Sequence, residues 1–296
     1  MKLLVFIAIL TLFACNNNNI DARYLTTYSD WQQQRINQLK AKNGWLNLAG
    51  LYWLNEGDNT FGSDTLNNII FPENKAPLHC GNILFKNNII TLQAAEKVTI
   101  FADGIPVKSK ILVCDTAKNP TLVTVDSLAF FIIKRGNKYA VRLRDYQSNN
   151  INKLTDIPYY APSENWIIEA DYTLLDTAFF ISIVKGNGNT EQQKIESKIT
   201  FTLEGVVYQI LPITEGDELF IIIGDKTNGH ETYGGGRFMD VPKPLKSGKI
   251  ALDFNKLYNP PCVFSAFANC PMPPKQNKIQ CAINAGEKVP DAFKIH

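Results

Sequence analysis

Short runs of β-branched and aromatic residues recur along most of this chain, and that rhythm restricts the fold more than any other feature. The runs follow one another roughly every eight to twelve residues with turn residues between them, which is typical of a sandwich or barrel. Asp103-Gly104 and Gly136-Asn137 each separate two such runs, as expected of tight hairpins. The pattern predicts a mainly β protein rather than alternating strands and helices.

One amphipathic helix precedes the strands. It is indicated by residues at steps of three and four, which fall on one helical face: Tyr24, Tyr28, Trp31, Arg35 and Leu39. Gly44 follows where a left-handed helix stop is common. We expect the aromatic face to pack on the body of the protein.

The strand rhythm is interrupted between Asp145 and Asn165. A polar stretch, Ser148-Asn149-Asn150, is followed there by Pro158 and Pro162, which predicts a connection between two modules. We therefore predict two β-sandwich or barrel-like modules, the first with the helix over residues 24–155 and the second over residues 156–296. In the second module, apolar runs predict strands at residues 179–184, 198–203, 206–211, 219–223, 250–254 and 279–283.

The first residues have the pattern of an export signal. Lys2 precedes an apolar run from Leu3 to Phe13, which is shorter than the roughly 20 residues of a membrane-spanning helix. Leu12-Phe13-Ala14-Cys15 resembles the lipobox of bacterial lipoproteins, whose cysteine is lipidated. The resemblance implies a signal peptide over residues 1–14, a lipid anchor at Cys15, a polar tether over residues 15–23 and a body exported to the cell envelope. The alternative is an ordinary signal peptide with an incidental cysteine.

Charge and metal-ligand residues argue against two classes of function. The 30 Lys and Arg residues nearly balance the 28 Asp and Glu residues, without a basic block, so no nucleic-acid partner is predicted. The three histidines are scattered and no Cys-x-x-Cys pair occurs. We therefore expect no metal site and no cofactor.

The composition changes after Ile223, where a polar, glycine-rich segment follows an apolar strand. The glycines at 234–236 let backbone N–H groups approach a ligand closely, and Arg237 offers a fork of donors for an anion. A tight turn in which Arg237 pairs internally with Asp225 or Asp253 is the other interpretation. The candidate pocket for a small polar or anionic ligand comprises Asp225, Thr227, Thr232, Tyr233, Arg237, Asp253, Asn255, Tyr258 and Asn259.

Cys262 and Cys270 lie in a proline-rich segment that forms a rigid, extended loop. In an oxidising compartment they could close this loop as a disulfide. They could also be a nucleophile and a resolving thiol, and the candidates for activating the thiol are His230 and Arg237.

The same segments resemble a known family. Residues 232–238 (Thr-Tyr-Gly-Gly-Gly-Arg-Phe), 252–255, 258–262, 270–274 and 285–287 are similar to the hallmark run of a bacterial family called domain of unknown function 1684. Residues 44–54 and 61–64, with Trp31 and Arg35, are similar to its N-terminal pattern, so the resemblance spans roughly residues 24–288. The resemblance implies no reaction, because the family has no established activity.

A looser likeness concerns the first module. Residues 59–64, 69–71 and 103–107 are arranged like those of a forkhead-associated β-sandwich. Such domains read phosphothreonine with an arginine and a serine. Ser63 stands where the arginine is expected, so the likeness implies a shape rather than phosphopeptide binding.

Three functions remain open. The first is a membrane-tethered binding module that uses the C-terminal candidate pocket. The second is a hydrolase or transferase with Asp225 or Asp253 as general base, or Cys262 as nucleophile. The third is a structural envelope protein in which the polar cluster is a hydrogen-bonded plug.

Overall fold

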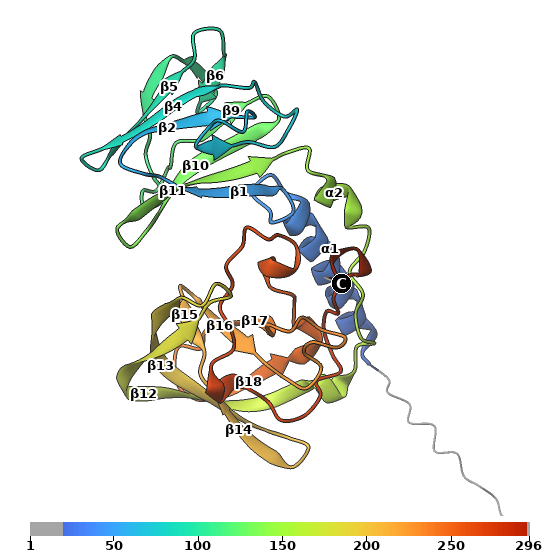
Figure 1. Ribbon diagram of the computed structural model, residues 1–296. Coiled ribbons are helices and arrows are strands. Elements are labelled where there is room, and N and C mark those ends of the chain that lie inside the picture. Colours follow the sequence, from blue (N-terminus) through green and yellow to red (C-terminus); the bar gives the residue numbers. More distant parts are fainter. Residues whose placement is uncertain (1–19, 295–296) are drawn as a thin grey trace, which may run out of the picture.

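The computed structural model describes residues 20–294, so the predicted signal peptide and Cys15 lie outside the described residues. The protein is mainly β, with two β modules and the N-terminal helix α1 (Ala22–Lys40), as Figure 1 shows. The predicted fold class is therefore confirmed. Within residues 20–294, no helix combines the length and apolar character needed to cross a membrane.

The helix α1 has the face that its sequence spacing predicts. Its N-cap Asp21 accepts a hydrogen bond from the backbone N–H of Arg23 at 2.9 Å, which satisfies one of the free donors of the first turn. Tyr28 stacks between Tyr24 and Trp31, with ring centroids 5.8 and 5.7 Å apart. Tyr28 is buried, so this aromatic row packs on the body at its centre.

The first module consists of two sheets whose strands are mostly antiparallel. Its six-stranded sheet has the order β1-β11-β10-β9-β6-β7, and its five-stranded sheet has the order β3-β2-β4-β5-β8. The strands are β1 (Leu48–Trp53), β2 (Gly57–Gly62), β3 (Ile69–Ile70), β4 (Gly81–Lys86), β5 (Ile89–Ala94), β6 (Ile100–Ala102), β7 (Ile105–Val107), β8 (Ser109–Ile111), β9 (Val123–Val125), β10 (Leu128–Arg135) and β11 (Lys138–Asp145). Phe61, Phe71 and Phe130 form an aromatic centre in its core, with ring centroids 5.5 to 6.0 Å apart.

Backbone geometry explains the β6–β7 hairpin. Asp103 and Gly104 have φ values of 52° and 79°, and two successive positive φ values match the twist of a two-residue hairpin. The Asp-Gly dipeptide is among the few that adopt this geometry readily. The predicted hairpin forms at these two residues.

The second module also contains two sheets, with the orders β14-β13-β12-β18 and β15-β16-β17. Its strands are β12 (Ile167–Val184), β13 (Thr190–Leu203), β14 (Val206–Ile210), β15 (Ile213–Glu215), β16 (Glu218–Ile223), β17 (Arg237–Pro242) and β18 (Gly248–Asp253). Every second residue of β13 is buried from Ile195 to Leu203, as expected of a strand with one face on a core. That core includes Tyr172, Phe201 and Phe254.

The predicted strand at residues 279–283 is wrong. This segment follows a short 3-10 turn (Lys275–Asn277) and runs as irregular backbone. Ile279 and Ile283 are buried, but the N–H of Ile279 bonds to the carbonyl of Gly224 at 2.7 Å and that of Ile283 to the Asp225 carboxylate at 3.3 Å. The apolar run therefore reflects burial, and its hydrogen bonds to other backbone groups go to the segment that follows β16, without a continuous strand ladder.

The helix α1 packs on the second module, although the sequence places it before the first. A buried cluster at the junction joins α1, the connection between the modules and a loop after β18: Leu39, Leu46, Leu154, Ile157, Val263 and Phe264. The connection contains a second short helix, α2 (Asn149–Lys153), which lies beside α1 in Figure 1. This junction holds α1 against the C-terminal sheets and so creates the site described next.

Candidate functional site

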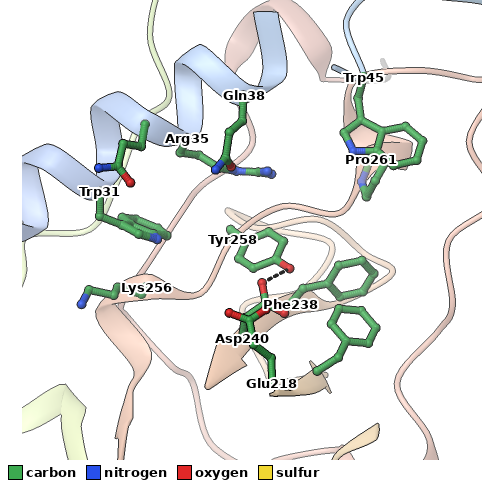
Figure 2. Close-up of a pocket in the computed structure, with 12 residues that line it drawn as sticks. Trp31, Arg35, Gln38, Trp45, Glu218, Phe238, Asp240, Lys256, Tyr258 and Pro261 are labelled. Atoms are coloured by element: carbon green, nitrogen blue, oxygen red, sulfur yellow. Dashed lines mark hydrogen bonds between the residues drawn. The ribbon is translucent and has the colours of Figure 1, made fainter. Parts of the chain in front are cut away.

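A cleft of about 640 Å³ lies between α1 and strands β16 and β17 (Figure 2). Its helical wall consists of residues at steps of three and four, which share one face of α1: Trp31, Gln34, Arg35 and Gln38. The opposite wall and the rim consist of Trp45, Glu218, Phe220, Phe238, Asp240, Lys256, Tyr258 and Pro261. We call this the α1 cleft.

Arg35 is fixed in the cleft by a buried carboxylate. Its Nε donates to Oε1 of Glu287 at 3.0 Å, and its Nη2 donates to the carbonyl of Asn259 at 2.7 Å. The Glu287 side chain is fully buried, whereas that of Arg35 is 12% exposed. The guanidinium carbon lies 4.6 Å from the centre of the Tyr258 ring, which adds a cation–π contact. Arg35 therefore connects α1 to the floor of the cleft.

The opposite wall carries acidic side chains where β16 begins and β17 ends. Phe220 on β16 lies opposite Asp240 on β17, and Glu218 precedes Phe220 on the same face of its strand. The hydroxyl of Tyr258 donates to Oδ2 of Asp240 at 2.7 Å. Burial, followed by the charge of Asp240, raises the pKa of Tyr258, so its hydroxyl stays a donor.

Two carboxylates of the α1 cleft remain available for a ligand. Glu218 and Asp240 are both exposed, and neither forms an ion pair within residues 20–294. Burial, followed by the charges of Asp240 and Glu218, also raises the pKa of nearby Glu215. By contrast, Lys256 is 3.3 Å from Asp253, and Arg35 is paired with Glu287. The uncompensated charge in the cleft is therefore negative.

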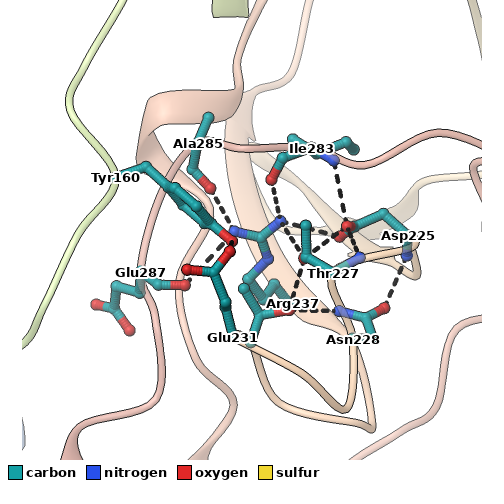
Figure 3. Close-up of polar contacts among 10 residues, drawn as sticks. Tyr160, Asp225, Thr227, Asn228, Glu231, Arg237, Ile283, Ala285 and Glu287 are labelled. Carbon is teal, nitrogen blue, oxygen red and sulfur yellow. Dashed lines mark hydrogen bonds and ion pairs between the residues drawn. The ribbon is translucent and has the colours of Figure 1, made fainter.

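Arg237, the centre of the predicted pocket, is instead fully buried and bonded within the protein (Figure 3). Its Nη2 donates to Oδ2 of Asp225 at 2.9 Å and to the carbonyl of Ile283 at 2.9 Å. Its Nη1 donates to the carbonyls of Ala285 and Glu287. The prediction that Arg237 faces an anionic ligand is corrected by this geometry, and the internal pairing that the sequence left open is what the structure shows.

The neighbours of Arg237 are also occupied. Oδ1 of Asp225 accepts from the N–H of Thr227 at 2.8 Å and from its hydroxyl at 2.6 Å, and the hydroxyls of Thr227 and Thr232 lie 2.8 Å apart. Gly236 has a φ of 88°, and a Cβ there would lie 2.6 Å from the carbonyl oxygen of Ile223. This glycine therefore serves close packing of two chain segments rather than the approach of a ligand.

The remaining residues of the predicted pocket form hydrogen bonds between separate segments of the chain. The carboxylate of Asp253 accepts from the hydroxyl of Tyr24, with both oxygens at 3.0 Å, and Asn255 bonds to the N–H and carbonyl of Ser163. The side-chain amide of Asn259 donates to the carbonyl of Lys288 at 2.8 Å. Tyr233 packs beside the junction cluster.

The predicted pocket residues do not converge on one hollow. Tyr258 lines the α1 cleft, and Asp225 borders a separate pocket of about 300 Å³ that shares no lining residue with it. Sequence reasoning missed the helical wall and the Glu218–Asp240 edge. The sequence does contain a signal for the helical wall. Gln34 and Gln38 add polar side chains beside the aromatic face of α1, a combination that a binding surface would show.

Cys262 and Cys270 form a disulfide, with Cα atoms 6.0 Å apart. Cys262 therefore has no free thiol in this structure, and the mechanism with a nucleophile and a resolving thiol lacks its first requirement. The bridge closes the loop that contains Val263 and Phe264 of the junction cluster. We call residues 263–269 the disulfide loop.

Comparisons with known proteins give a family match over most of the second module. Residues 152–288 match the family described as protein of unknown function (DUF1684), which confirms the resemblance for this part of the chain. No curated protein matches.

A solution NMR structure of an uncharacterised protein from Haloarcula marismortui is 27% identical, with 46% of this chain and 78% of that chain covered and a TM-score of 0.40. A structure of forkhead-associated domain interactions that depend on phosphothreonine is 13% identical, covers 32% and 92% of the two chains, and has a TM-score of 0.23. At these TM-scores neither likeness decides a function.

Proposed function

We propose that this chain, whose second module matches a family of unknown function, is an exported, lipid-anchored binding module that holds a small polar ligand in the α1 cleft. The observation that carries the proposal is a solvent-accessible cleft with aromatic walls and two carboxylates without an ion-pair partner in the described chain. Ligand sites commonly combine such walls with a few orienting polar groups.

The ligand chemistry follows from the charges. Carboxylates accept hydrogen bonds from hydroxyl and ammonium groups, and charge-assisted bonds are stronger than neutral ones. Glu218 and Asp240 therefore favour a ligand rich in hydroxyl or amino groups. The aromatic rings of Trp31 and Phe238 provide flat, apolar surfaces for its carbon skeleton. An anion is disfavoured here, because Arg35 is already paired with Glu287.

The test measures binding of small sugars and amino acids to the mature protein. N-acetylglucosamine, glucosamine, lysine and glutamate are titrated by calorimetry, with tryptophan fluorescence as a second signal because Trp31 and Trp45 line the cleft. We expect the amino sugars to bind and glutamate to bind least. Asp240→Asn should weaken binding about tenfold, equivalent to roughly 1.4 kcal/mol.

Glu169→Gln is the matched control, because Glu169 is an exposed carboxylate on β12 that pairs with Lys249 outside the cleft. It should leave the affinity unchanged. If none of the probes binds, or if Asp240→Asn binds as well as the unaltered protein, the α1 cleft is not the ligand site. The polar groups would then serve only structure.

Membrane anchoring is tested at Cys15. An acyl chain adds about 0.8 kcal/mol of membrane affinity for each buried CH₂ group, so loss of the lipid should release the protein. We expect Cys15→Ser to move the protein from the membrane fraction to the soluble fraction of bacterial cells. Cys114→Ser, at a half-buried free cysteine, should not. Membrane association that survives Cys15→Ser would rule out a lipid anchor at this residue.

A further inference from the structure

A second cavity, of about 510 Å³, adjoins the α1 cleft. The two cavities share Trp45, whose side chain is 38% exposed and stands at the edge of the cleft in Figure 2. The second cavity lies between the six-stranded sheet of the first module and two loops of the second. We call it the inter-module cavity.

Strand register builds the wall from the first module. Arg142 on β11 lies opposite Leu51 on β1, and Ala140 lies opposite Trp53. Residues two positions apart on a strand point to the same face of the sheet. Arg142 and Trp53 therefore lie beside each other on one face. Ala140, opposite Trp53, has only a methyl side chain and covers little of the indole. Trp53 is 48% exposed.

Amide side chains supply the opposite wall. Asn187 and Asn189 lie in the turn between β12 and β13, and Asn269 lies at the end of the disulfide loop. The side-chain oxygen of Asn269 accepts from the N–H of Asn187 at 3.2 Å. The disulfide loop also contacts the first module, because Nη1 of Arg142 donates to the carbonyl of Phe267 at 2.8 Å. The wall is thus held from both modules.

The charge of the inter-module cavity is opposite to that of the α1 cleft. Arg135 pairs with Asp115 at 2.7 Å, and Lys185 pairs with Glu191. Arg142 has no carboxylate partner among residues 20–294. Burial, followed by the charges of Arg135 and Arg144, lowers the pKa of Arg142 to about 10, so the guanidinium is still charged at neutral pH and an anion would relieve the repulsion.

We propose that the α1 cleft and the inter-module cavity form one groove that binds an acidic oligosaccharide, with an acidic group of the sugar chain at Arg142. The inference rests on the proposed function and names its ligand class. Three of the chain's four tryptophans, Trp31, Trp45 and Trp53, line the two cavities. Indole rings in both cavities suit a ligand made of repeated ring units.

The groove matches sugar rings in three ways. The C–H face of a sugar ring packs on the electron-rich face of an indole. Amides donate and accept at once, as hydroxyl groups do, and they line both cavities as Gln34, Gln38, Asn187, Asn189 and Asn269. The planar guanidinium of Arg142 is suited to a carboxylate or other oxyanion. Aliphatic anchors for a peptide are few, with Leu51 and Ile133 in the inter-module cavity.

The experiment compares ligand length and charge. Calorimetry of the full mature protein uses the hyaluronan tetrasaccharide, in which N-acetylglucosamine alternates with glucuronate, the neutral tetramer chitotetraose and the monomer N-acetylglucosamine. A neutral N-acetylglucosamine unit can then lie in the negatively charged α1 cleft while a glucuronate lies at Arg142. We expect the hyaluronan tetrasaccharide to bind at least tenfold tighter than the monomer. Trp53→Ala should weaken both tetramers about tenfold, and Arg142→Gln should weaken only the hyaluronan tetrasaccharide. Neither change should affect the monomer, which occupies the α1 cleft.

Two controls test for general damage. Phe101→Ala removes an exposed aromatic side chain from β6 of the same sheet, and Arg23→Gln removes an exposed charge from α1. Both should bind like the unaltered protein. Melting temperatures measured for every variant identify folding defects, and Arg142→Lys, which keeps the charge, should retain part of the preference for the acidic tetramer.

The possible failures are distinguishable. If N-acetylglucosamine binds through Asp240 but the tetramers gain nothing from Trp53 or Arg142, the groove is wrong and the proposed function stands. If neither the monomer nor the tetramers bind, both are wrong. If tetraglutamate binds with the same dependence on Trp53 and Arg142 while the hyaluronan tetrasaccharide does not, the ligand is a peptide and the oligosaccharide assignment is overturned.

Discussion

Replacing Arg237 with alanine is expected to lower the free energy of unfolding by about 3–5 kcal/mol, the usual loss when one partner of a buried ion pair is removed. The side chains of Arg237 and Asp225 are both fully buried. Without the guanidinium, the Asp225 carboxylate and the carbonyls of Ile283 and Ala285 lose donors in a region that water does not reach. Urea unfolding followed by circular dichroism measures the loss.

Two variants make this prediction specific. Arg237→Lys keeps the charge but not the planar fork, so it should recover only part of the lost stability. Lys249→Ala removes an exposed ion-pair partner of Asp171 and should leave the stability almost unchanged. If Arg237→Ala unfolds at nearly the same urea concentration as the unaltered protein, the buried network contributes no stability.

Replacing Glu287 with alanine is expected to have an effect of similar size, again about 3–5 kcal/mol. The Glu287 side chain is fully buried and accepts from Nε of Arg35 at 3.0 Å and from the N–H of Asn259 at 2.6 Å. Its loss leaves a nearly buried arginine without its carboxylate partner and the buried N–H of Asn259 without an acceptor. Because Arg35 belongs to α1, the helix should loosen from the second module.

Two readouts follow the loss of Glu287. Urea unfolding gives the stability, and tryptophan fluorescence compared with that of a Trp31→Phe variant reports on α1, because Trp31 stacks on Tyr28 next to the contact. Glu231→Ala is the matched control: its carboxylate is 53% exposed and pairs with Lys288 at 2.7 Å, so its loss should leave the stability almost unchanged. Equal stabilities of the two variants would show that Glu287 does not hold α1 in place.

Local signals predicted several elements correctly. The Asp103-Gly104 dipeptide specifies its hairpin because few residues accept positive φ, and the spacing of Tyr24, Tyr28 and Trp31 specifies a helical face. Residues 279–283 show the limit of such reasoning. An apolar run indicates burial, and whether a neighbouring strand lies within hydrogen-bonding distance depends on the rest of the fold.

The candidate site was less predictable than the fold. The cleft joins Arg35 of α1 to Asp240 of β17, which are far apart in the sequence, and no local pattern relates them. The polar segment after Ile223 did mark an important region, but its composition does not distinguish a ligand pocket from a buried network. That distinction depends on whether Asp225 or solvent faces Arg237.

By itself, the sequence determined the elements that depend on neighbouring residues: the helix, the strand-rich character of both modules and the tight turns. Only the tertiary structure decided which charges are neutralised and which stay open. Arg237 and Glu218 are both charged, yet one is fully buried against Asp225 and the other is exposed in the cleft. The physical reason is that burial and pairing depend on segments brought together from across the chain, and these contacts set the free energy of each charge.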